Sequence, residues 1–279
     1  MNKKMSKILF SLFFFYGLSC LLFSPLFSLD NSYFSSELFT KEFTSELKNF
    51  SKIYQSRPII TNSGEMRSPD QLSLFFILKK ISPNIVIESG VWHGLSTWTI
   101  RQAIDPSTTI ICLDPLDTII YRDQNAKYYI EKNFVDFQDL EIQQNPCDKI
   151  LAFFDDHIDA FERLIQCYNK GIKYVFFNDN YPPGFGSHLT LNQIIKGHSK
   201  HANQKELLEK KMILEKIIET YFIFPNVFSF RTFPSSNSTF LYHYTNPKRN
   251  NPFYRIYYNE ADYYRWNTFV ELKTINPLK

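Results

Sequence analysis

One segment constrains the fold more than any other: a short apolar run followed by a glycine turn and the start of a helix. Residues 85–88 (Ile-Val-Ile-Glu) are β-branched and apolar up to the acid at their end, which predicts a short buried strand. Gly90 and Gly94 mark a tight turn, and Ser96 or Thr97 can cap the helix that follows. Glycines let a backbone approach a ligand closely, and the first N–H groups of a helix are free. The segment therefore predicts a ligand cradle.

A second apolar run supplies the next part of such a cradle. Residues 109–113 predict a strand, and Asp114 at its end can accept hydrogen bonds from ribose hydroxyls. A dinucleotide fingerprint would require G-x-G-x-x-G, but the two glycines of the turn are separated by Val91, Trp92 and His93. These bulky residues leave little room for a pyrophosphate. An ordinary strand–turn–helix unit without a cofactor remains the alternative.

Strands and helices alternate through most of the chain. This pattern predicts an α/β fold, with a Rossmann-like doubly wound sheet that is mostly parallel, helices on both faces and an antiparallel hairpin at one edge. Ligands of such sheets bind at the carboxyl ends of the strands. We expect helices within 30–64, from Ser68, and at 121–134, 158–168 and 204–222, further strands at 140–143, 149–154 and 173–177, and the hairpin at 227–233 and 239–244.

The N-terminus is typical of a targeting segment. Lys3, Lys4 and Lys7 precede an uncharged run, residues 8–29, which predicts a signal peptide or a membrane anchor. By the positive-inside rule the lysines stay cytoplasmic, so we expect the protein to be secreted, periplasmic or anchored at the membrane. The chain then divides into this segment (1–29), a linker with covering helices (30–67), an α/β domain (68–245) and a C-terminal extension (246–279).

Composition adds few constraints. A chain of 279 residues is long enough to bury a full core, and most of it fits one domain. The net charge of +3 neither favours nor excludes nucleic-acid binding. The four cysteines have no C-x-x-C spacing, so neither a zinc site nor a disulfide framework is indicated.

Polar side chains follow two of the expected strands at their carboxyl ends. Asp155, Asp156 and His157 come after the strand at 149–154, and Asp179 and Asn180 come after the next one. Neighbouring parallel strands end side by side, so these groups should converge. Carboxylate and amide oxygens suit Mg²⁺ or another divalent cation. Helix caps and Asx-turns are the structural alternative for each aspartate and asparagine.

Two of these motifs resemble those of known families. The pattern Glu88-x-Gly90-x-x-x-Gly94 resembles the first motif of class I S-adenosylmethionine-dependent methyltransferases, in the form of the macrolide-sugar and rhamnosyl O-methyltransferases. Residues 178–184 (Asn-Asp-Asn-Tyr-Pro-Pro-Gly) are similar to the element after the fifth strand of metal-dependent O-methyltransferases, catechol O-methyltransferase among them. The resemblance implies an S-adenosylmethionine site formed by Glu88, Gly90, Trp92, Gly94, Ser96 and Asp114. It also implies the metal ligands Asp156, Asp179 and Asn180, with Asp155 as a competing choice for the first.

The resemblance implies methyl transfer from S-adenosylmethionine to a hydroxyl of a small molecule or a sugar. A divalent cation such as Mg²⁺ would lower the pKa of that hydroxyl. His157, Asp159 or His93 would take the proton. The choice is open because this chain has Asp159 at the position where the catechol type has a lysine. We expect no nucleic-acid partner, and a membrane partner only through the N-terminal segment. An exported non-catalytic protein with this fold, a nucleotide-sugar-dependent glycosyltransferase and an NAD-dependent oxidoreductase remain alternatives.

Two structural expectations test this hypothesis. If Gly90 lies against the cofactor, Gly90→Val should abolish binding of S-adenosylhomocysteine with little loss of folded protein. If the metal site is as implied, the carboxylates of Asp156 and Asp179 should share one ion about 2.1 Å from each oxygen. They should also border the loop that contains Gly90.

Overall fold

The computed structural model divides the chain into residues 1–30 and residues 31–279. It describes residues 36–60, 66–145, 147–224, 260 and 263–274, all of which belong to the second unit. The apolar N-terminal run and the hairpin expected at 227–233 and 239–244 lie outside the described residues. Among the helices of the described ranges, none is long and apolar enough to cross a membrane.

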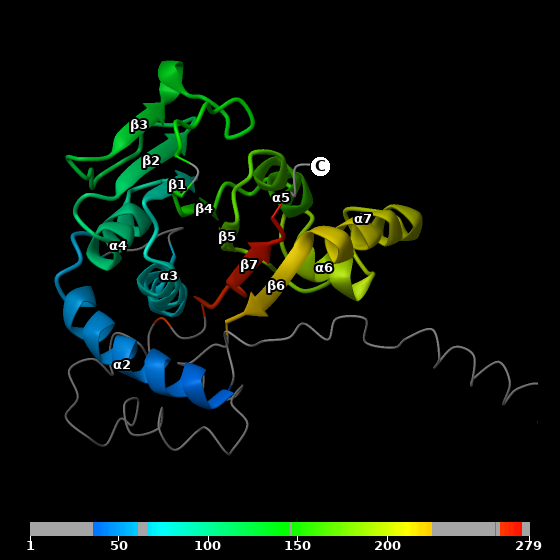
Figure 1. The fold of residues 1–279 in the computed structure, drawn as a ribbon, viewed down its shortest axis with the longest axis horizontal. Helices are drawn as coiled ribbons and strands as arrows, with labels where there is room; N and C mark the ends of the chain where they lie inside the picture. Colours follow the sequence, from blue (N-terminus) through cyan, green and yellow to red (C-terminus); the bar gives the residue numbers. More distant parts are fainter. Residues whose placement is uncertain (1–35, 61–65, 146, 225–259, 261–262, 275–279) are drawn as a thin grey trace, which may run out of the picture. The chain divides into compact units, whose positions relative to one another are not determined.

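In the part of the chain that the structure describes, seven strands form one sheet, namely β1 (Ile85–Ser89), β2 (Thr109–Asp114), β3 (Lys127–Ile130), β4 (Ile150–Phe154), β5 (Tyr174–Phe177), β6 (Ile218–Ile223) and β7 (Thr268–Leu272). Their order across the sheet is β3-β2-β1-β4-β5-β7-β6 (Figure 1). Strands β1 to β5 pair in parallel, whereas β7 pairs antiparallel with both β5 and β6. The Rossmann-like, mostly parallel sheet with an antiparallel edge is therefore confirmed.

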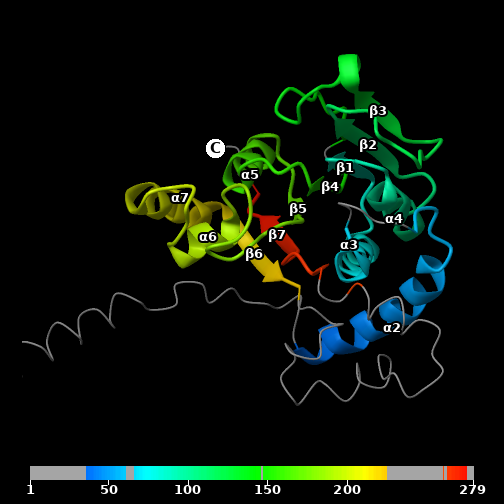
Figure 2. The ribbon, with the colours of Figure 1, turned by 180° about the vertical axis from the view of Figure 1, so that it is seen from behind.

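Helices cover both faces of this sheet (Figures 1 and 2). They are α2 (Ser36–Tyr54), α3 (Ser68–Ile81), α4 (Leu95–Ala103), α5 (Ala160–Asn169), α6 (Leu191–Lys196) and α7 (Gln204–Ile217). Helices α2, α3 and α4 share one apolar core with one face of the sheet, which we call the α4 face. On the opposite face, the α5 face, the guanidinium of Arg163 in α5 lies 5.7 Å from the ring centre of Phe154 in β4.

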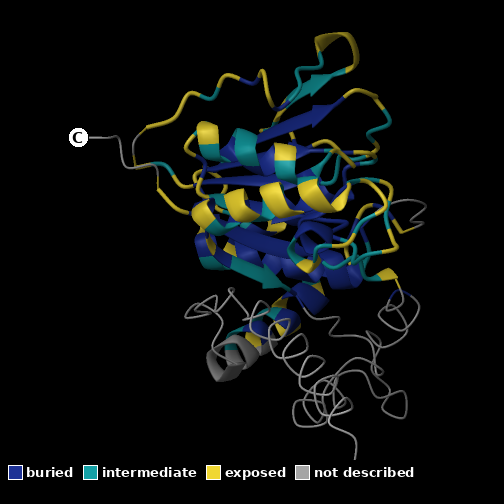
Figure 3. Cartoon of the chain, turned by 90° about the vertical axis from the view of Figure 1, so that its right-hand side faces the viewer, coloured by how far each residue is buried: buried dark blue, intermediate teal, exposed yellow. Residues whose placement is uncertain are grey.

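The two faces follow from the alternation of side chains along each strand. Val86, Leu151, Phe153 and Phe176 belong to the core of the α4 face, so their neighbours in sequence point to the α5 face. Strands β1, β4 and β7 are buried at every position, because helices cover both sides (Figure 3). This burial explains why residues 85–87 of β1 and the whole of β4 are continuous apolar runs instead of alternating in polarity.

The region between β2 and β4 differs from the prediction. The helix expected at 121–134 is wrong, because residues 127–130 form the edge strand β3 and Glu131–Asn133 a single 3-10 turn. The strand expected at 140–143 is also wrong, because those residues have no regular structure. Strand β3 is only half buried at the edge of the sheet, so its residues do not show the alternation of apolar and polar side chains that marks a strand. Pairing with β2 decides its structure.

The far edge of the sheet also differs. Helix α7 ends at Ile217, and residues 218–222, which we expected to be helical, belong to β6. β-Branched and aromatic residues dominate this stretch, which favours a strand once a partner is present. That partner, β7, lies within residues 246–279, where we expected an extension outside the α/β domain.

Candidate active site

The acid at the end of β1 is buried on the α4 face. Glu88 is fully inaccessible to solvent, and its Oε2 accepts a 2.6 Å hydrogen bond from the Thr97 hydroxyl. Its Oε1 has no hydrogen-bond partner within the part of the chain that the structure describes. Burial raises the pKa of Glu88 to about 7, although hydrogen bonds from Ser96, Thr97 and Cys112 oppose the shift. A buried carboxyl with one unpartnered oxygen is a natural place for a ligand donor.

The helix after the glycine turn begins differently from the prediction. Gly94 is the N-cap of α4, in the left-handed conformation, and no side chain caps the helix. Ser96 and Thr97 lie inside the first turn, where both hydroxyls hydrogen-bond Glu88 instead of the helix backbone. The expectation that Ser96 or Thr97 caps this helix is therefore wrong.

Gly90 allows a close contact between two loops of the chain. It has φ +91°, and a Cβ built on it would lie 2.5 Å from the backbone oxygen of Asp155. Even alanine would therefore strain the backbone and collide with the loop after β4. The expectation that Gly90→Val leaves the fold intact is wrong. The same contact shows that the glycine loop and the residues after β4 adjoin.

The acid at the end of β2 organises the glycine loop. Asp114 Oδ2 accepts hydrogen bonds of 2.9 Å from the backbone N–H groups of Val91 and Trp92, and Oδ1 accepts one from Leu116. Within the described residues, Oδ1 accepts only this one hydrogen bond and has a second lone pair, so a ribose hydroxyl could still donate to it. Trp92 is 41% exposed and stacks on His93 with ring centres 4.7 Å apart.

Asp155 and Asp156 point to opposite faces of the sheet. They follow Phe153 and Phe154, and strand alternation places Asp155 on the α4 face with Phe153 and Asp156 on the α5 face with Phe154. Asp155 Oδ1 accepts a 2.8 Å hydrogen bond from the side-chain amide of Asn178. Only Asp155 therefore faces the same side as Glu88.

Asp156 is part of an ion pair on the α5 face. Its Oδ2 accepts hydrogen bonds from the Ser89 hydroxyl at 2.7 Å and from Arg163 Nε at 2.9 Å. Arg163 is 2% exposed and also binds Asp136 through both terminal nitrogens, at 2.8 and 2.9 Å. The expected sharing of one ion by Asp156 and Asp179 is not found, because the Asp156 carboxylate is committed to Arg163.

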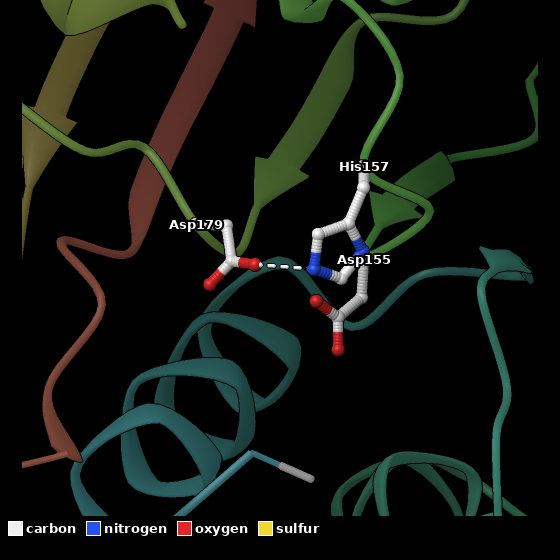
Figure 4. A group of neighbouring side chains, drawn as sticks. All are labelled: Asp155, His157 and Asp179. Atoms are coloured by element: carbon white, nitrogen blue, oxygen red, sulfur yellow. Dashed lines mark ion pairs between the residues drawn. The ribbon is translucent and has the colours of Figure 1, made fainter. Parts of the chain in front are cut away.

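Three side chains do converge at the carboxyl ends of β4 and β5. Asp155, His157 and Asp179 each place a ligand atom within 4.8 Å of the other two (Figure 4). His157 Nε2 lies 2.9 Å from Asp179 Oδ2. Both residues have positive φ, +59° for His157 and +55° for Asp179. This sparsely populated conformation, which clusters at functional sites, breaks the strand alternation in both loops.

The pKa values within this group are strongly shifted. Burial and the nearby charge of Asp179 raise the pKa of Asp155 to about 7. The hydrogen bond to Asp179 is the main cause that raises the pKa of His157 to about 9. Burial opposes ionisation of Asp179, but the bond from His157 and the charge of Arg265 outweigh it and lower its pKa. The group is therefore built to hold positive charge between its two carboxylates.

Two residues of the site were missed in the sequence. Arg265 Nη1 lies 3.3 Å from Asp179 Oδ1, and its backbone N–H donates to the fully buried Asp70 in the first turn of α3. The His188 ring centre lies 5.8 Å from that of His157. Burial and the charge of His157 lower the pKa of His188, so it is neutral at neutral pH. His188 follows the Asn-Asp-Asn motif closely, which was a usable signal, whereas nothing local marks Arg265.

The other residues expected at the site have structural contacts. Asn180 is 1% exposed, donates from its amide nitrogen to Tyr221 and Thr268, and accepts at Oδ1 from the Asn192 backbone. Asp159 caps α5 by accepting from Phe161 N and pairs with Lys210 at 2.9 Å. The structure does not bring Asp159 or His93 into the group of Asp155, His157 and Asp179.

No family model and no curated protein matches the chain. Solved structures with a similar fold include an O-methyltransferase from Bacillus cereus in complex with S-adenosylhomocysteine (11% identity, 62% of this chain and 77% of that chain, TM-score 0.38). They also include TomG from Streptomyces achromogenes in complex with S-adenosylmethionine (9% identity, 83% of this chain and 89% of that chain, TM-score 0.43). A third is CmcI in a Mg–S-adenosylmethionine complex (14% identity, 60% of this chain and 69% of that chain, TM-score 0.38). The Rossmann-like fold expected from the sequence is confirmed by the sheet itself, with antiparallel β7 inserted between β5 and β6.

Proposed function

We propose that this chain transfers a methyl group from S-adenosylmethionine to a hydroxyl of a small molecule or a sugar. One observation carries the proposal. The group of Asp155, His157 and Asp179 adjoins the glycine loop at the carboxyl edge of a methyltransferase-like sheet. The two loops lie so close that a Cβ on Gly90 would be 2.5 Å from the backbone oxygen of Asp155. This edge is where open α/β sheets bind their ligands.

The residues around the glycine loop fit the cofactor. Glu88 Oε1 lacks a hydrogen-bond partner in the described part of the chain, and a cofactor ammonium or hydroxyl could supply one. Asp114 fixes the loop by accepting from two backbone N–H groups at Oδ2, and Oδ1 keeps a lone pair for a ribose hydroxyl. Trp92 is exposed beside this acid and offers an apolar surface to an adenine ring.

The donor set also fits a divalent cation. Asp155, His157 and Asp179 would hold it, because one ligand atom of each lies within 4.8 Å of the other two. His157 Nε2 hydrogen-bonds Asp179 Oδ2 at 2.9 Å in the structure, and a bound cation would take the place of that proton. When bound, such a cation would lower the pKa of the acceptor hydroxyl.

The chain's own residues would orient the acceptor and take its proton. His188 is neutral at neutral pH and lies beside His157, so a ring nitrogen of His188 can accept the hydroxyl proton. S-adenosylmethionine, when bound, would supply the methyl group to the acceptor oxygen and would leave as S-adenosylhomocysteine. Arg265 holds the Asp179 carboxylate in place during this step.

Calorimetry on the full-length protein with S-adenosylhomocysteine, NAD and UDP tests the proposal. We expect S-adenosylhomocysteine to bind and Glu88→Gln to weaken its binding. Glu219→Gln, a change of an exposed acid in β6, should leave binding unchanged. Binding of NAD or UDP in place of S-adenosylhomocysteine would overturn the proposal, because it would indicate an oxidoreductase or a glycosyltransferase. Cofactor binding without methyl transfer to any phenolic or sugar acceptor would favour a non-catalytic protein.

We further propose that residues 1–29 are a signal peptide or membrane anchor. Support comes from the three lysines followed by an uncharged apolar run. Separating cell fractions and sequencing the N-terminus of the mature protein tests this proposal. A protein found in the cytoplasm with its N-terminus intact would contradict it.

A further inference from the structure

We propose that the cation site of this protein takes a first-row transition ion such as Mn²⁺, Co²⁺ or Zn²⁺ in preference to Mg²⁺, through the imidazole nitrogen of His157. This inference rests on the proposed function, since it concerns the site that the methyl acceptor would occupy. It follows from which ligand atoms the fold leaves available.

The fold removes two of the oxygen ligands that the sequence offers. Asn180 donates from its amide nitrogen to Tyr221 and Thr268 and accepts at Oδ1 from the backbone of Asn192, so these bonds hold its side chain against β6, β7 and α6. Asp156 is held on the α5 face by Arg163. Asp155 and Asp179 remain, and two carboxylates alone would leave a hard ion with few protein ligands.

The third ligand atom is a nitrogen. His157 Nε2 hydrogen-bonds Asp179 Oδ2 at 2.9 Å, and a bound cation would take the place of the proton between them. The ligand atoms of His157, Asp155 and Asp179 all fall within 4.8 Å of one another. Imidazole suits zinc, iron, cobalt and nickel, whereas Mg²⁺ prefers oxygen ligands and retains water. A set of two carboxylates and one imidazole therefore favours a transition ion.

Both carboxylates are already oriented by outer partners. The Asn178 amide donates to Asp155 Oδ1 at 2.8 Å, and Arg265 donates to Asp179 Oδ1 at 3.3 Å. Outer hydrogen bonds of this kind fix the direction of ligating side chains in metal sites. On Asp179 they leave Oδ2, the oxygen beside His157, as the ligand atom.

The test is calorimetry of MgCl₂, MnCl₂ and CoCl₂ binding to the full-length protein, with pulsed electron paramagnetic resonance of the Mn²⁺ form. We expect Mn²⁺ and Co²⁺ to bind at least about tenfold more tightly than Mg²⁺, and the Mn²⁺ signal to show coupling to a nitrogen nucleus. His157→Gln replaces the nitrogen by an amide oxygen. It should abolish that coupling and lower Co²⁺ affinity by about tenfold, with little change for Mg²⁺.

Asp155→Asn and Asp179→Asn should weaken the binding of every ion, whereas Glu162→Gln, a change of an exposed acid in α5, should weaken the binding of none. Absence of binding by any ion, equal affinity for Mg²⁺ and Mn²⁺, or bound Mn²⁺ without nitrogen coupling would overturn the proposal. S-adenosylhomocysteine is titrated in parallel. If it binds while no ion does, the metal inference fails and the proposed function stands; if only the ion binds, the proposed function fails.

Discussion

The ion pair between Arg163 and Asp156 gives a sharp test of where Asp156 belongs. Arg163→Met keeps most of the side-chain volume and removes the charge. It would leave Asp156, whose side chain is 12% exposed, without its guanidinium partner, and Asp136, which is 32% exposed, without two hydrogen bonds. Among the described residues, the Ser89 hydroxyl and the Ile158 backbone N–H would still donate to the Asp156 carboxylate.

The magnitude follows from the burial of the two acids. Removing one partner of a buried charge pair costs about 3–5 kcal/mol. Asp136 regains water when Arg163 is removed, so we reduce the expected loss in the free energy of unfolding to about 2–4 kcal/mol. Arg122→Met is the control, because its partner Asp117 and Arg122 itself are 32% and 41% exposed. That exposed pair should contribute less than about 1 kcal/mol.

Urea denaturation of the two variants and the wild type, followed by circular dichroism, measures both changes. If Arg163→Met changes the free energy of unfolding no more than Arg122→Met does, the ion pair does not hold Asp156. Asp156 would then be free to turn toward Asp179, as the sequence suggested.

Two further predictions concern the glycine loop and the first turn of α3. Gly90→Ala should lower the melting temperature more than Gly184→Ala. Both glycines have φ +91°, but of the two only Gly90 would place the new Cβ against backbone, 2.5 Å from the Asp155 oxygen. Equal shifts of the melting temperature would contradict the close approach of the two loops. Burial raises the pKa of Asp70 to about 8 from its usual 3.8, so the folded state keeps a proton that the unfolded state has lost. The stability from this group is complete below about pH 4 and declines as the pH rises through 8. Asp70→Asn should make the free energy of unfolding depend less on pH between these values, and an unchanged slope in denaturation series would show that Asp70 does not titrate as described.

Much of the fold is determined by local pattern. The apolar runs of β1, β2, β4 and β5, each followed by a polar cluster, predicted a parallel sheet and the edge at which a ligand binds. The glycine turn after β1 predicted a tight approach, although its partner proved to be the backbone of Asp155. These features are recoverable because strand periodicity and turn chemistry act over a few residues.

Pairing across the sheet decided the elements that the sequence misassigned. Strand β3 is a half-buried edge, and β6 continues directly from α7. In neither does the pattern of apolar residues distinguish a strand from a helix. Both become strands because β2 and β7 supply backbone partners. Strand β7 itself joins β5 from more than 90 residues along the chain, as the pairing of Tyr174 with Glu271 shows.

The site depends on tertiary structure for the same reason. Asp155 and Asp156 are adjacent acids after a strand that is apolar on both faces, so the sequence could not tell which one faces Glu88. Arg163 from α5 binds one of them, and Arg265, held by Asp70 of α3, reaches Asp179. The sequence by itself determined which residue types gather at the carboxyl edge. Only the tertiary structure decided which of them meet, because a side chain's partner depends on the face it points to and on segments far away in the chain.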